Sequence, residues 1–142
     1  MEFSEFSARL NLWLDEPSAA HLDCWVDDAN VQLARVEGGI RCSIDVLDPF
    51  DASAPDRLMG ILGQGGASVA CRCPGALGTD PQSQCLVLLH WMPPPSSVEA
   101  LLGVLQTLAN QRAAMLSLMH KTLFDSSTAE SRLATTNWRT GV

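Results

Sequence analysis

The stretch of residues 96–124 constrains the fold most, because it predicts one helix that is long for a chain of 142 residues. The prolines at positions 93–95 end whatever structure precedes it, since proline lacks an N–H donor. Ser96 and Glu99 have the spacing of a capping box at a helix start. At 1.5 Å per residue, a helix of this length extends over roughly 40 Å. It must therefore lie across a whole sheet or reach a second subunit.

Apolar residues within this stretch recur mostly at spacings of three and four, the pattern of an amphipathic helix. They are Val98, Leu101, Leu102, Leu105, Leu108, Ala109, Met115, Leu116, Met119 and Leu123. We expect this stripe to cover one face of a sheet.

The net charge of −7 is distributed unevenly along the chain. Residues 1–56 hold twelve acidic side chains and three arginines, whereas residues 57–142 hold four acidic and six basic ones. The first part is thus near −9 and the second near +2. Because nucleic acids need a basic surface, we expect no nucleic-acid partner. The acidic part favours basic or polar protein partners, or serves solubility alone.

Length and composition predict one globular domain with its own core. No apolar run approaches the roughly 20 residues of a membrane span. The acidic N-terminus lacks the cationic stretch of a secretory signal. We therefore expect a cytoplasmic protein without a membrane span. The five cysteines are odd in number, which disfavours a disulfide framework.

Residues 3–15 predict a short amphipathic helix that ends before Pro17. Its apolar stripe consists of Phe3, Phe6, Leu10, Trp13 and Leu14. Such a stripe packs on the chain's own sheet or stays partly exposed to bind another chain, and both possibilities remain open.

Residues 20–46 change to a period of two, which predicts an antiparallel meander of three strands. The expected strands lie at 20–26, 31–36 and 40–46, separated by a turn at 27–30 and a two-residue hairpin turn at Gly38-Gly39.

The second half of the chain predicts one more helix and two more strands before the long helix. The expected segments are a loop at 48–54, a short helix at 55–62, a strand at 67–73, a loop at 74–83 and a strand at 85–91. The last strand is apolar on both faces, so both faces need cover. The fold class is thus α+β with an antiparallel sheet, in the order α-β-β-β-α-β-β-α. We expect a single domain at 1–124 and a mostly disordered tail at 125–142.

The side chains that carry chemistry form no convincing active site. The possible zinc ligands are Cys71, Cys73, Cys85 and His90, but they lack the two close pairs of common zinc sites. No pattern sets a histidine beside a cysteine with a third orienting group. The glycine-rich residues 63–66 follow a helix, whereas a phosphate-binding loop follows a strand. We expect no metal, no cofactor and no enzyme activity, with a small thiol- or metal-dependent enzyme as a remaining alternative.

Several stretches resemble the class I type III secretion chaperones, also called the Tir-chaperone-like family, which are small, acidic bacterial proteins. These are residues 6–10 and 13–14 for the first helix, 58–62 and 65–69 for the short helix and fourth strand, and 85–93 and 97–102 for the last strand and closing helix. The resemblance covers residues 3–123 and lies in the order of elements, size and charge.

This resemblance implies a homodimer that binds the N-terminal segment of a cognate secreted effector in extended form and keeps it secretion-competent. The implied effector-binding residues are Leu10, Trp13, Leu14, Trp25 and Val36. The implied dimer interface contains Leu58, Ile61, Leu62, Leu86 and Leu88. A dimeric α+β adaptor or secretion-system regulator that binds no unfolded segment is the alternative.

Overall fold

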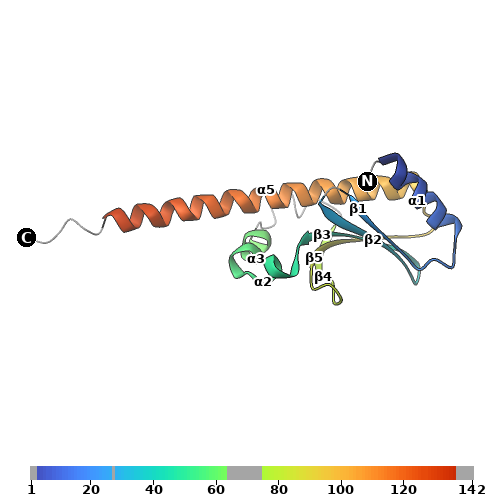
Figure 1. Cartoon of the computed structure of the whole chain (residues 1–142), viewed down its shortest axis with the longest axis horizontal. Helices are drawn as coiled ribbons and strands as arrows, with labels where there is room; N and C mark the ends of the chain where they lie inside the picture. The colour runs from blue at the N-terminus through green and yellow to red at the C-terminus, as the bar shows by residue number, and fades with distance from the viewer. Residues whose placement is uncertain (1–2, 27, 64–74, 137–142) are drawn as a thin grey trace, which may run out of the picture.

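The computed structural model describes residues 3–26, 28–63 and 75–136, with side chains from Ser4 to Lys121 within those ranges. In chain order the elements are α1 (Phe3–Asp15), β1 (His21–Val26), β2 (Ala29–Val36), β3 (Gly39–Leu47), α2 (Pro49–Ser53), α3 (Pro55–Leu62), β4 (Ala76–Thr79), β5 (Leu86–Met92) and α5 (Val98–Thr136). Figure 1 traces them from the blue α1 to the red end of α5.

The strands form one antiparallel sheet in the order β1-β2-β3-β5-β4, which confirms the predicted α+β class. One row of paired residues crosses it, namely Cys24, Val31, Ile44, Leu88 and Leu77. Because side chains alternate between the faces of a sheet, the whole row points to one side.

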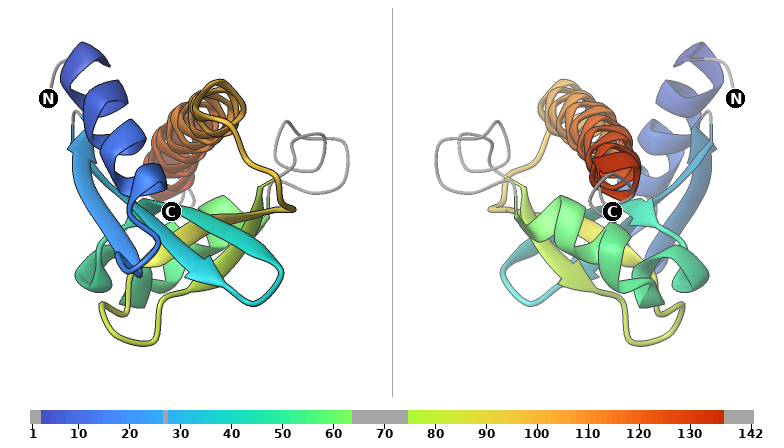
Figure 2. Two further views of the ribbon diagram at one scale, coloured as in Figure 1. Left: turned by 90° about the vertical axis from the view of Figure 1, so that its right-hand side faces the viewer. Right: turned by 90° about the vertical axis from the view of Figure 1, so that its left-hand side faces the viewer.

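The helices α1 and α5 both lie on that side of the sheet, and α2 and α3 lie under the middle of α5 (Figures 1 and 2). The core is enclosed between them. Its fully buried members include Leu10 of α1, Leu33 of β2, Ile61 of α3, and Leu101, Leu108 and Met115 of α5. The other side of the sheet carries no helix within the described ranges. We call it the open face, and its side chains are Asp23, Trp25, Asn30, Gln32, Arg41, Ser43, Asp45, Val87, Leu89 and Trp91.

Two polar side chains fix α5 to the sheet. The Arg112 Nε donates to the Asp45 carbonyl oxygen at 2.6 Å, and its terminal nitrogens donate to the Asp28 carboxylate at 3.0 and 3.2 Å. The buried Gln111 side chain accepts from the Gly75 N–H at 3.2 Å and donates to the Gly75 carbonyl at 3.1 Å. A Cβ at position 75 would lie 2.6 Å from the Gln111 oxygen, so the close pairing depends on glycine.

The long helix is confirmed, but both of its ends differ from the sequence prediction. It begins at Val98 and is capped by Ser97 rather than Ser96, because the Ala100 N–H donates to the Ser97 hydroxyl at 3.2 Å. It continues to Thr136, so residues 125–136 are helical where the sequence predicts a mostly disordered tail. These residues contain no Pro or Gly that would end a helix. Residues 137–142 lie outside the described residues, and the domain boundary at 124 stays a prediction.

The helix α2 occupies a segment where the sequence predicts a loop. The Asp48 side chain caps it by accepting from the Asp51 N–H at 2.7 Å, and Pro49 stands in its first turn. Its five residues are too few to show a helical period in the sequence.

The strand β4 also lies in a predicted loop. It pairs with β5, and a Cβ at Gly78 would lie 2.7 Å from the Leu89 Cδ1 atom. The glycine thus permits the close approach, and pairing with β5 rather than β propensity makes this segment a strand. The strand predicted at 67–73 lies outside the described residues.

The hairpin between β2 and β3 turns one residue earlier than predicted. Val36 pairs with Gly39, so the turn residues are Glu37 and Gly38. Gly38 has a φ of 80°, which glycine adopts without strain. Gly39 is a strand residue, and a Cβ there would lie 2.1 Å from the Met92 carbonyl oxygen.

Candidate partner-binding surfaces

Arg35 of β2 holds the C-terminal end of α1 on the sheet. Its guanidinium donates to the carbonyl oxygens of Trp13 at 2.8 Å, Leu14 at 3.2 Å and Ala19 at 3.3 Å. Its Cζ atom also lies 4.5 Å from the centre of the Trp13 ring, a cation–π contact. The last turn of α1 has no basic residue of its own, so a residue from β2 supplies the positive charge that stabilises this helix end.

A groove of about 610 Å³ lies beside this end of α1. We call it the α1 groove. Leu14 of α1 and Val36 of β2 line it together with Ile40 of β3 and Val98 of α5, and polar side chains such as Asn11 complete it. The structure thus brings together two of the residues that the family resemblance implied for effector binding.

The other three implied effector-binding residues lie elsewhere. Leu10 and Trp13 are core residues, only 0% and 4% exposed, because the apolar stripe of α1 packs on the sheet. Their implied role in effector binding stays a prediction. Trp25 lies on the open face and is 64% exposed.

The outer edge of β1 is a second candidate surface. Among the described residues β1 pairs only with β2, and the Arg35 N–H donates to the Ala20 carbonyl at 2.9 Å. Bonded and non-bonded pairs alternate in an antiparallel ladder, so the backbone groups of His21, Asp23 and Trp25 point away from β2. Unpaired groups along an edge strand can accept another extended chain.

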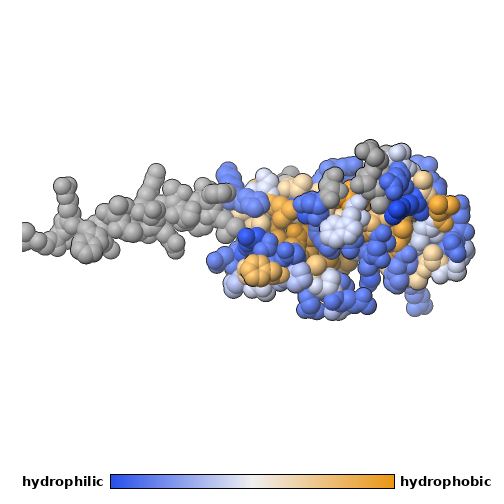
Figure 3. Space-filling model, viewed as in Figure 1, coloured by the Kyte–Doolittle hydropathy of each residue, from blue (hydrophilic) through white to orange (hydrophobic). Residues whose placement is uncertain are grey.

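Exposed apolar side chains also gather on the two short helices. Phe50 of α2 and Met59 and Leu62 of α3 are 80%, 65% and 53% exposed, and we call them the α2–α3 surface. Figure 3 shows hydrophobic surface, in orange, among polar residues in this region below α5. Large exposed apolar side chains in one region are typical of an interaction surface.

The implied dimer-interface residues divide between this surface and the core. Leu62 is exposed, and Leu58 is partly buried against the core. Ile61, Leu86 and Leu88 are buried inside the protomer, the last two because β5 turns them toward α5. Their implied role in a dimer interface stays a prediction.

Three exposed side chains, Phe50, Met59 and Trp91, were not among the sequence candidates. Phe50 stood in a predicted loop, and Met59 was counted as part of the apolar pattern of the short helix. Trp91 lies on the open face of β5, and its alternation with Leu88 and Met92 would have indicated this side.

The cysteines within the described ranges are not suited to nucleophilic chemistry. Cys24, Cys42 and Cys85 are buried and form no disulfide. Burial raises the pKa of the Cys42 thiol to about 12 and also raises the pKa of Cys24. Cys71 and Cys73 lie outside the described residues.

The described part of the chain holds no group of three or more His, Cys, Asp or Glu side chains arranged to bind a metal ion. None of its helices is both long enough and apolar enough to cross a membrane.

Solved structures with the same arrangement come from type III secretion complexes. A chain of the heterodimeric ExoU–SpcU complex from the type III secretion system of Pseudomonas aeruginosa matches with a TM-score of 0.55 and 18% identity, over 82% of this chain and 97% of that chain. A chain of the ExsC–ExsE complex matches with a TM-score of 0.51 and 13% identity, over 79% of this chain and 92% of that chain. The chain has a class I type III secretion chaperone-like fold. No family model and no curated protein matches it.

The chaperone-like fold therefore presents four surfaces to a partner. They are the α1 groove, the outer edge of β1, the open face and the α2–α3 surface.

Proposed function

We propose that this chain is a cytoplasmic bacterial type III secretion chaperone. It binds the N-terminal segment of a cognate secreted effector in extended form and keeps that segment secretion-competent, without catalysis. The observation that carries the proposal is a chaperone-like fold in which no other described strand pairs with the outer side of the edge strand β1.

The proposed mechanism is strand addition at β1. An extended effector segment pairs its backbone with the outward groups of His21, Asp23 and Trp25. Its apolar side chains cover the exposed Trp25 ring and enter the α1 groove at Leu14 and Val36. A segment held in this way cannot fold or aggregate before secretion.

The proposal includes a homodimer. The α2–α3 surface supplies the apolar contact, with Leu62 at its centre and Leu58 at its base. A short helix such as α3 gains stability from packing, which a second copy would extend.

The test is co-expression with a secreted protein encoded by a neighbouring gene. We expect the pair to purify together, and the effector's N-terminal segment to be protected from protease. Truncation of that segment should abolish the complex. A dimer that binds only a folded partner would favour the adaptor or regulator instead.

A proline in β1 tests strand addition directly. Asp23→Pro removes an N–H that points to the free edge and leaves the ladder to β2 intact. We expect effector binding to weaken about tenfold or more. Asp23→Ala is the matched control, because it loses the same hydrogen bond to Gln32 (2.9 Å) but keeps the N–H. Equal effector affinity of the two variants, with circular dichroism showing both folded, would exclude strand addition at β1.

A further inference from the structure

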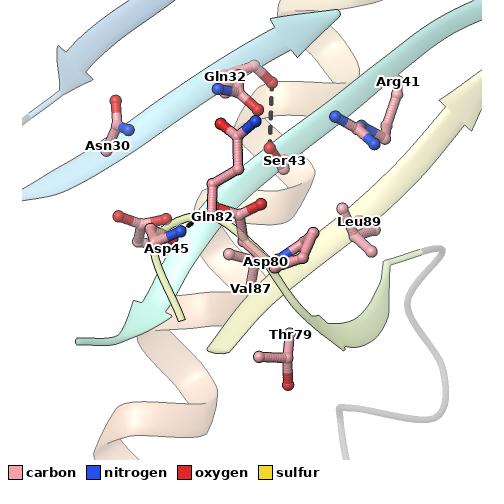
Figure 4. A pocket seen from close by; sticks show the side chains of 12 residues that line it. Asn30, Gln32, Arg41, Ser43, Asp45, Thr79, Asp80, Gln82, Val87 and Leu89 are labelled. Carbon is pink, nitrogen blue, oxygen red and sulfur yellow. Dashed lines mark hydrogen bonds between the residues drawn. The ribbon is translucent and has the colours of Figure 1, made fainter. Parts of the chain in front are cut away.

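The open face contains a recess of about 370 Å³ that the effector mechanism above does not use. Figure 4 shows its walls: Asn30 and Gln32 come from β2, Ser43 and Asp45 from β3, and Asp80 and Gln82 from the loop before β5. Val87 and Leu89 of β5 supply its apolar side.

The loop that forms one rim is held by hydrogen bonds of its own. The Asp80 N–H donates to the Cys85 carbonyl at 3.0 Å, and the Gln84 N–H donates to the Asp80 carbonyl at 2.8 Å. The Asp80 carboxylate also accepts from the Ser83 N–H at 2.9 Å. The loop that forms this rim is therefore held in one conformation by its own hydrogen bonds.

The floor of the recess contains one polar atom without a hydrogen-bond partner and one acidic side chain. The Asn30 Oδ1 atom is buried and has no hydrogen-bond partner. Burial, and next the nearby Asp80 carboxylate, raise the pKa of Asp45, whereas Arg112 and a hydrogen bond with Cys85 lower it. Arg112 is the nearby cation, but its donors are directed to the Asp45 main-chain oxygen and to Asp28.

One cation already borders the recess without filling it. The Arg41 side chain lies toward Leu89, away from Asn30 and Asp45 (Figure 4). It is exposed and contributes to lowering the pKa of Asp80, after the hydrogen bonds from Ser83. Arg41 thus leaves room on the Asp45 side of the recess.

We propose that this recess binds a lysine or arginine side chain of the effector segment, with the cationic group at the Asp45 and Asp80 carboxylates and the aliphatic stem against Val87 and Leu89. This inference rests on the proposed function for the source of the side chain. Charge complementarity selects the occupant, because the acceptors are acidic or carbonyl-like and residues 1–56 are near −9. The apolar wall suits the methylene groups of a long basic side chain.

The recess can be tested on this chain alone with a small probe. N-acetyl-arginine amide carries the guanidinium, and N-acetyl-citrulline amide has nearly the same shape without the charge. In a ¹H–¹⁵N NMR titration we expect the arginine probe to shift the signals of Asn30, Ser43, Asp45 and Asp80. We expect the citrulline probe to bind at least about tenfold more weakly. N-acetyl-lysine amide then distinguishes an ammonium from a guanidinium.

Two variants and one control locate the site. Asp45→Asn and Asp80→Asn each remove one charge and keep a side-chain oxygen, and each should weaken arginine binding about tenfold. Glu37→Gln changes an exposed acid in the β2–β3 turn outside the recess and should leave it unchanged. Equal binding of both probes, shifts elsewhere on the molecule, or equal losses in all three variants would overturn the proposal.

The same variants separate this inference from the proposed function. If the arginine probe binds in the recess but no secreted protein binds the chain, the proposed function fails and the recess stands as a site for a basic side chain. If an effector binds wild type and Asp45→Asn equally well and the probe shifts no recess signal, the recess proposal fails alone.

Discussion

The two faces of the sheet consist of the same strands but differ in how far their side chains are buried. On the helix side, Leu86 and Leu88 of β5 are buried beneath α5. On the open face of the same strand, Leu89 is half-buried and Trp91 is 52% exposed. Only Val87 is buried there, in the wall of the recess formed with the loop before β5.

The buried side chains of one face stabilise the fold, whereas the exposed side chains of the other are available for the proposed function. Side chains on the helix side have all their neighbours within one chain, so their burial stabilises the fold. The open face, the β1 edge and the α2–α3 surface keep apolar area and unpaired groups that the other described residues do not cover. The proposed function, which is to hold another chain, needs both kinds of surface.

The largest expected effect compares neighbouring leucines of β5. Leu88→Ala removes a fully buried side chain and should lower the free energy of unfolding by about 2–5 kcal/mol. Leu89→Ala, on the open face, should cost less than about 1.5 kcal/mol. Urea unfolding of both variants measures the difference. Similar losses would contradict the division between the two faces.

The second prediction concerns the α2–α3 surface. Leu62→Asp should raise the dissociation constant of the homodimer about a hundredfold or more, because it places an unpaired charge in an apolar contact. Light scattering on a sizing column measures the mass against the 15.3 kDa of one chain. Leu12→Asp is the matched control on α1, where the leucine is equally free of the core. A Leu62→Asp dimer as stable as wild type would exclude this surface as the interface.

The third prediction contrasts two acids near Arg112. The Arg112 guanidinium lowers the pKa of Asp28 below 3.8, so this pair stabilises the fold above pH 3.8 and the effect disappears as pH falls through the lowered value. The stability advantage of wild type over Asp28→Asn should therefore shrink below pH 3.8.

Asp45 should show the opposite dependence. Burial, and next Asp80, raise its pKa, while Arg112 and the hydrogen bond with Cys85 act against this. Its ionised form thus costs stability at neutral pH, and the cost disappears as pH falls through the raised value to below 3.8. The free energy of unfolding of Asp45→Asn should therefore increase relative to that of wild type as pH rises over this range. Parallel pH profiles of the two variants in urea unfolding would contradict these assignments.

The smallest expected effect lies on the covering helix. Gly103 of α5 is exposed, and a Cβ there would meet no atom within 4 Å. Gly103→Ala should therefore raise the free energy of unfolding by about 0.5–1 kcal/mol through higher helix propensity. Thermal unfolding measures the gain. A loss of stability would show that α5 is packed more closely at this turn.

Most elements could be predicted from the sequence because their periods are long and regular. The alternation in β1 to β3 and the three-and-four spacing in α1 and α5 predicted the helices and strands correctly. α2 and β4 could not be predicted, since Asp48 capping and pairing with β5 create them. The cap of α5 moved by one residue for a similar reason: Ser96 and Ser97 look alike in sequence, and only Ser97 lies within reach of the Ala100 N–H.

The candidate site could be predicted only in part. An apolar residue in a regular pattern is expected to be covered, but the pattern does not tell whether the cover comes from the same chain. Leu10, Trp13, Ile61, Leu86 and Leu88 proved to be core, whereas Leu14, Trp25, Val36 and Leu62 reach the surface or a groove.

By itself the sequence determined the element types, the α+β class and the acidic front part, because these depend on local spacing and composition. Tertiary structure decided which apolar face lies under α5, which edge strand stays free, and that Asn30 and Asp45 meet the loop at Asp80. Such properties depend on which distant segments come together. Contacts of this kind follow from strand pairing and helix packing across the whole chain, and no local pattern records them.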